Sequence, residues 1–220
     1  MNLPPAKKVV FVVDEKNLPP PAPMGFRVAA FVADSVLIFF LSAISVKFLL
    51  PVFCPEGIFV FSEYYQEIQK TYEATLLSAV NGNTASTALL DEVLVRAANN
   101  ETLVEFFEII YTISFLSAAI YFVLTEFFMR GQTLGKRIFG LRTVIFGTPF
   151  PPLFLQMLSR ALWKAFTVVP SGMLLVILAI VNANIVAFSR RHRGWHDKLA
   201  RTEVIDLRAL EGKSARSMRF

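Results

Sequence analysis

A long apolar stretch at Met24–Leu50 constrains this chain more than any other feature. After Arg27, its only ionisable residues are Asp34 and Lys47. A helix needs about 20 apolar residues to cross a hydrocarbon core, so this stretch is long enough to span a membrane. Asp34 follows Arg27 on nearly the same helix face and lies roughly 10 Å deeper. Because a carboxylate at that depth is costly unless it is paired, protonated or hydrated, the sequence predicts a membrane protein with a buried acid.

The composition agrees with a membrane protein. The chain is 55% hydrophobic and 18% charged, with a mean hydropathy of +0.53. Its net charge of +5 comes from Lys and Arg beside apolar spans, where they set topology and meet anionic lipid head groups, so we do not expect nucleic-acid binding. The apolar run is too long for a cleaved signal peptide. Cys54 is the single cysteine, which excludes an intrachain disulfide.

The middle of the chain is a polar, helical segment with few cations, followed by a second apolar span and then by a segment rich in cations. Residues 51–102 are polar and predict helices over about Ser62–Val80 and Thr84–Ala98, divided by a turn at Asn81-Gly82-Asn83. Few Lys and Arg occur here, as is typical of an extracytoplasmic loop. A second span follows at Leu103–Met129, and the cations after it predict a cytoplasmic segment.

The apolar region 151–189 is too long for one span, and Pro170-Ser171-Gly172 divides it. The basic tail after it favours a cytoplasmic end, which requires an even number of crossings. We therefore expect a helical hairpin and four spans, at about 25–50, 103–129, 152–169 and 172–189. The alternative is an interfacial helix at 152–169 followed by one span, with the tail outside.

Short strands are predicted at Ile138–Phe146 and Thr202–Leu207. A lone strand is unstable in water, so we expect these two to pair on the cytoplasmic side, with Val9–Val13 as a candidate third member. The remaining ends are a proline-rich cytoplasmic leader at 1–23 and a basic cytoplasmic tail at 207–220. The predicted fold class is an all-α four-helix transmembrane bundle with a small cytoplasmic strand pair and a helical extracytoplasmic insertion.

Several polar motifs stand beside these spans in a fixed order. They are Arg27…Ala30…Asp34, Gly131-Gln132-Thr133-Leu134-Gly135-Lys136-Arg137, Gly140-Leu141-Arg142, Arg160, and His196-Asp197-Lys198-Leu199-Ala200. The pattern resembles the RDD family of bacterial membrane proteins, which is named for an arginine and two aspartates. The resemblance covers 24–50 and 103–206, so that 24–206 is an RDD-like transmembrane domain. Arg201 and the long 55–100 insertion depart from the family pattern.

The resemblance implies the positions of the three named residues and little about activity. It places them at Arg27, Asp34 and Asp197, and it implies a bacterial cytoplasmic membrane. The distribution of Lys and Arg predicts that both termini lie inside. The family is mostly uncharacterised, and some members have been proposed as sodium/proton antiporters.

The candidate site consists of the charged and polar residues in or beside the spans. These are Arg27, Asp34, Glu126, Arg160, Lys164, Asn182 and Asp197. In a structural interpretation they form pairs that lock helices together, Arg27 with Asp197 or Glu126, and Asp34 with Arg160 or Lys164. In a functional interpretation Asp34 alternately binds a proton and a cation. Asn182 and Asn184 are expected to make interhelical hydrogen bonds.

The sequence favours neither an enzyme nor a cofactor or metal site. The segment at 131–136 has three residues between its glycines where a nucleotide-binding loop needs four, so we expect a turn whose cations face lipid phosphates. His192 and His196 have ligand spacing but no third ligand nearby. No nucleophile–base arrangement is visible.

Two functions are compatible with these patterns. One is a cation/proton carrier or an accessory subunit of a transport complex, acting as a homo-oligomer or within a larger membrane complex. The alternative is a membrane scaffold that presents residues 55–100 or the basic strand layer to a partner. The chain has no visible internal repeat of the kind common in transporters.

Overall fold

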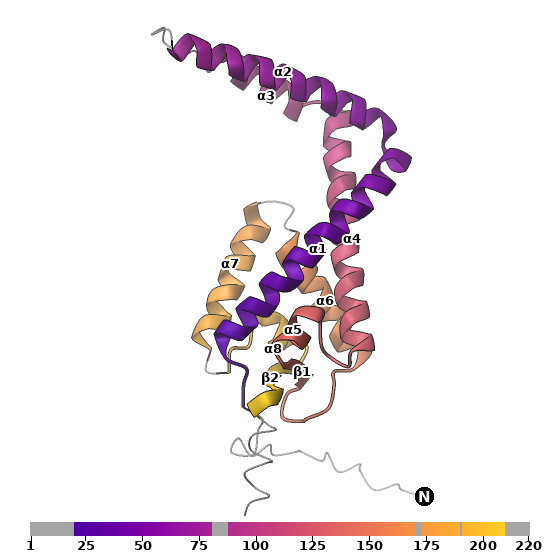
Figure 1. The fold of residues 1–220 in the computed structure, drawn as a ribbon, viewed down its shortest axis with the longest axis vertical. Helices are drawn as coiled ribbons and strands as arrows, with labels where there is room; N and C mark the ends of the chain where they lie inside the picture. The colour runs from indigo at the N-terminus through magenta and orange to yellow at the C-terminus, as the bar shows by residue number, and fades with distance from the viewer. Residues whose placement is uncertain (1–19, 81–87, 170–172, 190, 210–220) are drawn as a thin grey trace, which may run out of the picture.

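The computed structural model describes residues 20–80, 88–169, 173–189 and 191–209, and Figure 1 shows their arrangement. This part of the chain is mostly helical with one small sheet, as predicted. Its elements are α1 (Met24–Phe53), α2 (Pro55–Val80), α3 (Ala88–Ala98), α4 (Glu101–Phe128), α5 (Leu134–Ile138), β1 (Leu141–Ile145), α6 (Phe154–Val168), α7 (Met173–Phe188), α8 (Trp195–Leu199) and β2 (Thr202–Asp206).

Helices α1 and α4 pack against each other and form the long axis of the molecule (Figure 1). Among the described residues, these are the two helices long and apolar enough to cross a membrane. Only 11% of the most apolar stretch of α1 is buried in the protein, and 28% of that of α4. An apolar helix that the protein leaves uncovered needs an apolar surrounding. This surface indicates a membrane protein and agrees with the first two predicted spans.

The 51–102 insertion is helical, as predicted, and extends from one end of α1 and α4 as an arm (Figure 1). Its first helix begins at Pro55, earlier than expected, because Ile58 and Val60 pack on a cluster that includes Leu50, Cys54 and Phe106. The predicted turn at Asn81-Gly82-Asn83 lies outside the described residues.

Helices α6 and α7 pack together near the other end of the molecule (Figure 1). They have 15 and 16 residues, or about 23 and 24 Å, which is shorter than the roughly 30 Å of a hydrocarbon core. α6 contacts α4 through small residues, Ala161 and Ala165 against Ala118 and Ala119. Such residues let two helix backbones approach closely in lipid. The loop at 170–172 lies outside the described residues.

The predicted strand pair is present as an antiparallel ladder that runs from Leu141↔Asp206 to Ile145↔Thr202. β1 is shorter than predicted because Ile138 ends α5 and Gly140 takes a left-handed turn with φ of +66°. The chain before α1 also joins β2, through a bridge from Pro21 and a 3.0 Å hydrogen bond from the Ala22 amide. The predicted third strand, Val9–Val13, lies outside the described residues, as do most of the leader and the tail.

Candidate functional site: a buried charge network around a cavity

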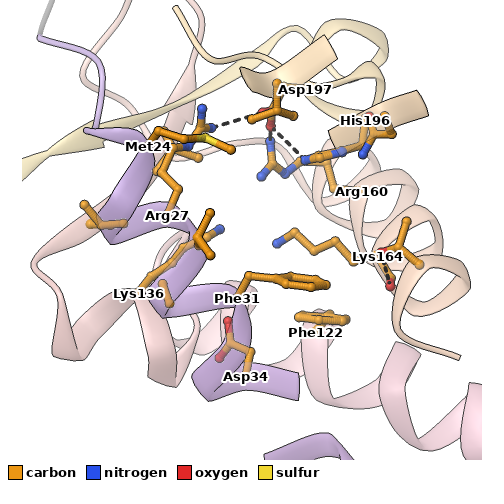
Figure 2. Close-up of a pocket in the computed structure, with 17 residues that line it drawn as sticks. Met24, Arg27, Phe31, Asp34, Phe122, Lys136, Arg160, Lys164, His196 and Asp197 are labelled. Atoms are coloured by element: carbon orange, nitrogen blue, oxygen red, sulfur yellow. Dashed lines mark hydrogen bonds and ion pairs between the residues drawn. The ribbon is translucent and has the colours of Figure 1, made fainter. Parts of the chain in front are cut away.

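Asp197 joins two arginines from different helices at the sheet end of the molecule. It is fully buried in α8, and its Oδ2 lies 3.2 Å from Arg27 Nη2 of α1. Its Oδ1 pairs with Arg160 of α6, which also donates to Thr202 in β2. Figure 2 shows both guanidinium groups turned toward this one carboxylate. Asp197 therefore ties α1 and α6 to α8, Arg160 ties α6 to the sheet, and the predicted Arg27–Asp197 pair is confirmed.

Glu126 is the second shared carboxylate. It is fully buried near the end of α4, and its Oε1 accepts from Lys136 Nζ of α5 at 2.8 Å and from Lys164 Nζ of α6. Its Oε2 lies 3.7 Å from Arg160 Nε. Lys136 also donates to Thr143 of β1 at 2.6 Å. We call the group Arg27, Glu126, Lys136, Arg160, Lys164 and Asp197 the charge network.

Asp34 is buried in α1 and is held by neutral donors. Its Oδ1 accepts from the Tyr121 hydroxyl at 2.7 Å and from the Gly135 amide at 2.8 Å, and its Oδ2 accepts from the Thr133 hydroxyl at 2.6 Å. The predicted ion pair of Asp34 with Arg160 or Lys164 is therefore wrong, because Tyr121 and the start of α5 donate the hydrogen bonds that the carboxylate accepts.

The close approach of α5 to α1 depends on a glycine. A Cβ on Gly135 would meet the backbone oxygen of Ala30 and would lie 2.9 Å from Asp34 Cγ. Gly131 begins this loop with φ of +91°, a conformation that L side chains rarely adopt. The segment that has some of the composition of a phosphate-binding loop does hold an anion, and that anion is Asp34.

The network borders a cavity of about 280 Å³. Lys136 and Lys164 reach it from opposite sides, Asp34 lies at the end away from Asp197, and the rings of Phe31 and Phe122 stand between (Figure 2). The cavity brings together the predicted residues Arg27, Asp34, Arg160, Lys164, Asn182 and Asp197. Glu126 lies behind this wall and contacts it through the lysines.

The two predicted asparagines differ. Asn182 Oδ1 accepts a 2.9 Å hydrogen bond from the Trp195 amide, so it fixes the start of α8 to α7. Asn184 is exposed and donates to the Ile180 carbonyl of its own helix. The expected interhelical role of Asn184 is therefore wrong, since its position on α7 turns it away from the other helices.

Burial and neighbouring charges perturb the groups at the sheet end. Burial alone would raise the pKa of Asp197, but Arg160, His196 and Arg27 together hold that pKa below its usual range. Burial lowers the pKa of His196 to about 4, although the nearby Asp197 opposes the change. Burial also lowers the pKa of Lys136, with Glu126 acting against it. Asp197 is thus ionised and His196 neutral at pH 7.

Sequence reasoning missed several partners of the network. The sequence pattern does not point to Tyr121, Thr133 or Thr143, and it predicts that Lys136 faces lipid phosphates, whereas Lys136 is buried against Glu126. Buried Glu203 pairs with Arg191 at 2.9 Å and was also missed. One sequence signal could have identified Lys136. It follows Glu126 by ten residues across a tight loop, a separation at which the two charges can pair.

The site has no arrangement of metal ligands in the described ranges, where no three His, Cys, Asp or Glu side chains cluster. His192 faces the Val186 carbonyl at 3.2 Å, and His196 lies 3.5 Å from Asp197. The two histidines therefore have different surroundings and do not form the pair of ligands that their spacing allows.

Comparison with known proteins supports the motif pattern. The family model described as the RDD family matches residues 21–201, which include α1, the whole charge network and every residue that lines the cavity except Val204. No curated protein and no solved structure shows significant similarity to the chain. The match covers most of the chain, and the chain therefore belongs to the RDD family.

Proposed function

We propose that the chain is a non-enzymatic, multi-pass scaffold or accessory subunit of a bacterial cytoplasmic membrane, with both termini inside. The observation that carries this proposal is that each cation of the charge network contacts a carboxylate of the same chain. Cations and carboxylates that pair across helices hold a fold together. The insertion outside, or the strand layer inside, then presents a surface to a homo-oligomeric copy or a larger membrane complex.

The pairing of the strands supports the proposed topology. β1 and β2 form one sheet, so the start of α6 and the end of α7 lie on the same side of the membrane. The contact of Ala22 with β2 puts the start of α1 on that side as well. Each intervening segment then crosses an even number of times, which argues against an interfacial α6 followed by one span. We infer four membrane helices, with α6 and α7 as a hairpin.

A labelling experiment tests the hairpin. Ser171→Cys, in a chain whose native thiol is removed by Cys54→Ser, should react with a membrane-impermeant maleimide added to the outside of intact cells. Because α6 and α7 are short, the rival outcome is a hairpin that enters and leaves without crossing. Absence of external labelling, with labelling after the membrane is opened, would refute four full spans.

The second candidate function is a cation/proton carrier, and one observation favours it. Asp34 lines the cavity and, among the described residues, accepts from three neutral donors without an ion pair. Such a carboxylate can exchange a proton for a small cation without breaking a salt bridge. The four cations around the same cavity oppose this, because they repel an entering cation.

Proteoliposomes distinguish the two functions. Dissipation of a pH gradient on adding sodium, potassium or lithium is compared among wild type, Asp34→Asn and a control, Glu108→Gln, which changes an exposed carboxyl on α4. We expect no cation-dependent proton movement from any of the three folded proteins. Movement by wild type and Glu108→Gln that is lost in folded Asp34→Asn would overturn the scaffold proposal and establish the carrier.

A further inference from the structure

The cavity carries an excess of positive charge. Four side chains of its wall are cationic, namely Arg27, Lys136, Arg160 and Lys164. The carboxylates available to them are Asp34, Asp197 and the adjoining Glu126. Four cations against three carboxylates leave one formal positive charge among the described residues. An uncompensated charge in a poorly hydrated site is expensive, so the site favours one anion.

One of these cations also has unused hydrogen-bond donors. Arg160 is 1% exposed, and its Nε and Nη2 have no hydrogen-bond partner within the described part of the chain. The Nε lies 3.7 Å from Glu126 Oε2, which is an ion-pair distance but not a hydrogen bond. A buried guanidinium normally satisfies its planar donors, and carboxylate or phosphate oxygens match that geometry. Arg160 lines the cavity, so an oxyanion placed there can reach it.

Apart from these charged groups and the polar residues Thr167, Asn182 and His196, the cavity wall is apolar. Val28 and Phe31 line it from α1, and they are 47% and 42% exposed on a helix that faces lipid. Val186 lines it from α7. The mouth is therefore beside the hydrocarbon tails of the bilayer, while the cations lie toward the sheet end (Figure 2). This combination suits a ligand with one negative head and an apolar tail.

We propose that the cavity binds the phosphate head of one anionic membrane phospholipid, whose acyl chains leave between α1 and α7. At about 280 Å³ the cavity has room for a phosphate group and its nearest carbons, and the acyl chains extend out of it. The head group supplies the missing negative charge and accepts from the free donors of Arg160. This inference goes beyond the scaffold or carrier role and holds for either.

Native mass spectrometry of the full chain tests the site. The probes are phosphatidylglycerol and zwitterionic phosphatidylcholine of the same chains. Val28→Trp and Val186→Phe fill the cavity from α1 and from α7 without changing charge. Val32→Trp is the matched control, one turn away on α1, where the residue is 53% exposed and outside the cavity. Thermal unfolding first identifies the variants that fold, and two filling variants are made so that one failure to fold leaves the other as a test.

We expect wild type and Val32→Trp to retain phosphatidylglycerol in preference to phosphatidylcholine. Each folded filling variant should retain at least fivefold less phosphatidylglycerol than wild type. Equal retention of the two lipids, or full retention of phosphatidylglycerol in a folded filling variant, would overturn the proposal. Inorganic phosphate is added to lipid-free protein as a separate probe. Stabilisation by phosphate with no bound phosphatidylglycerol would assign the site to a free anion and refute the lipid.

Discussion

Replacing the carboxylate that three cations share should destabilise the protein more than any single change at its surface. Glu126→Gln keeps the shape of the side chain and removes its charge, while Lys136, Lys164 and Arg160 stay buried around it. At an effective dielectric constant of 20, the gross attraction between Lys136 Nζ and Glu126 at 2.8 Å is about 6 kcal/mol. Desolvation offsets much of that attraction, so it is not the net contribution.

The net effect is set by the cations left behind. Removing one partner of a buried ion pair costs about 3–5 kcal/mol. Burial already lowers the pKa of Lys136, so this lysine can lose its proton in the variant. The loss of unfolding free energy should therefore lie near the low end of that range. About 3 kcal/mol is a change of more than 100-fold in the unfolding equilibrium, or about 6–12 °C in Tm for a chain of this size.

The assay is thermal unfolding of the purified protein in one detergent at pH 7. Glu108→Gln makes the same chemical change at an exposed position of the same helix and should leave Tm within about 2 °C of wild type. The double variant Glu126→Gln/Lys136→Met should be less destabilised than the sum of its single variants by at least about 1 kcal/mol. If Glu126→Gln matched Glu108→Gln in Tm, the network would not be holding the fold together.

Three further variants test particular contacts by the same measurement. Gly135→Ala should lower Tm by several degrees because its Cβ meets backbone of α1, whereas Gly25→Ala, with open space around it, should not; equal effects would refute the close contact. Asn182→Ala should cost about 1 kcal/mol, since it loses the hydrogen bond that starts α8, and exposed Asn184→Ala should cost less; the reverse order would contradict the assignment. The folded pKa of His196, about 4, is below its ordinary 6.5, so the unfolded chain binds more protons between these values. The free energy of unfolding should fall by up to about 2 kcal/mol from pH 7 to pH 5, and His196→Gln should reduce this dependence on pH. An unchanged slope in His196→Gln would show that another group titrates.

The sequence predicts the long helices and the strand pair because these elements have a local signal. The apolar length of α1 and α4 and the β-branched residues of β2 are visible without any tertiary information. The start of α2 was missed, because Pro55 begins a helix whose first turns are fixed by packing on Phe106, a long-range contact. The start of the predicted first strand is wrong for a similar reason, since the chain at Leu134–Ile138 forms a short helix that packs against α1.

The site was predicted as a set of residues but not as a set of pairs. Charges in apolar segments are conspicuous, and the cavity brings six of the predicted residues together. Which acid meets which base depends on helix rotation and on the reach of loops. The sequence offered Arg160 and Lys164 as partners for Asp34, but Thr133 and Gly135 occupy its lone pairs. Uncharged donors such as these cannot be identified from the distribution of charged residues in the sequence.

The pairing also accounts for how short helices can be held in a lipid-facing fold. Lipid tails are as apolar as the helix surfaces, so hydrophobic burial contributes little to bringing helices together inside a membrane, and packing and polar contacts do most of that work. α6 has only 15 residues, yet Arg160 and Lys164 connect it to carboxylates on α8 and α4. Arg27 connects α1 to the same carboxylate on α8. The network therefore specifies which helices are neighbours and how each is rotated, and it gives the short helix α6 interhelical contacts that hold it in place.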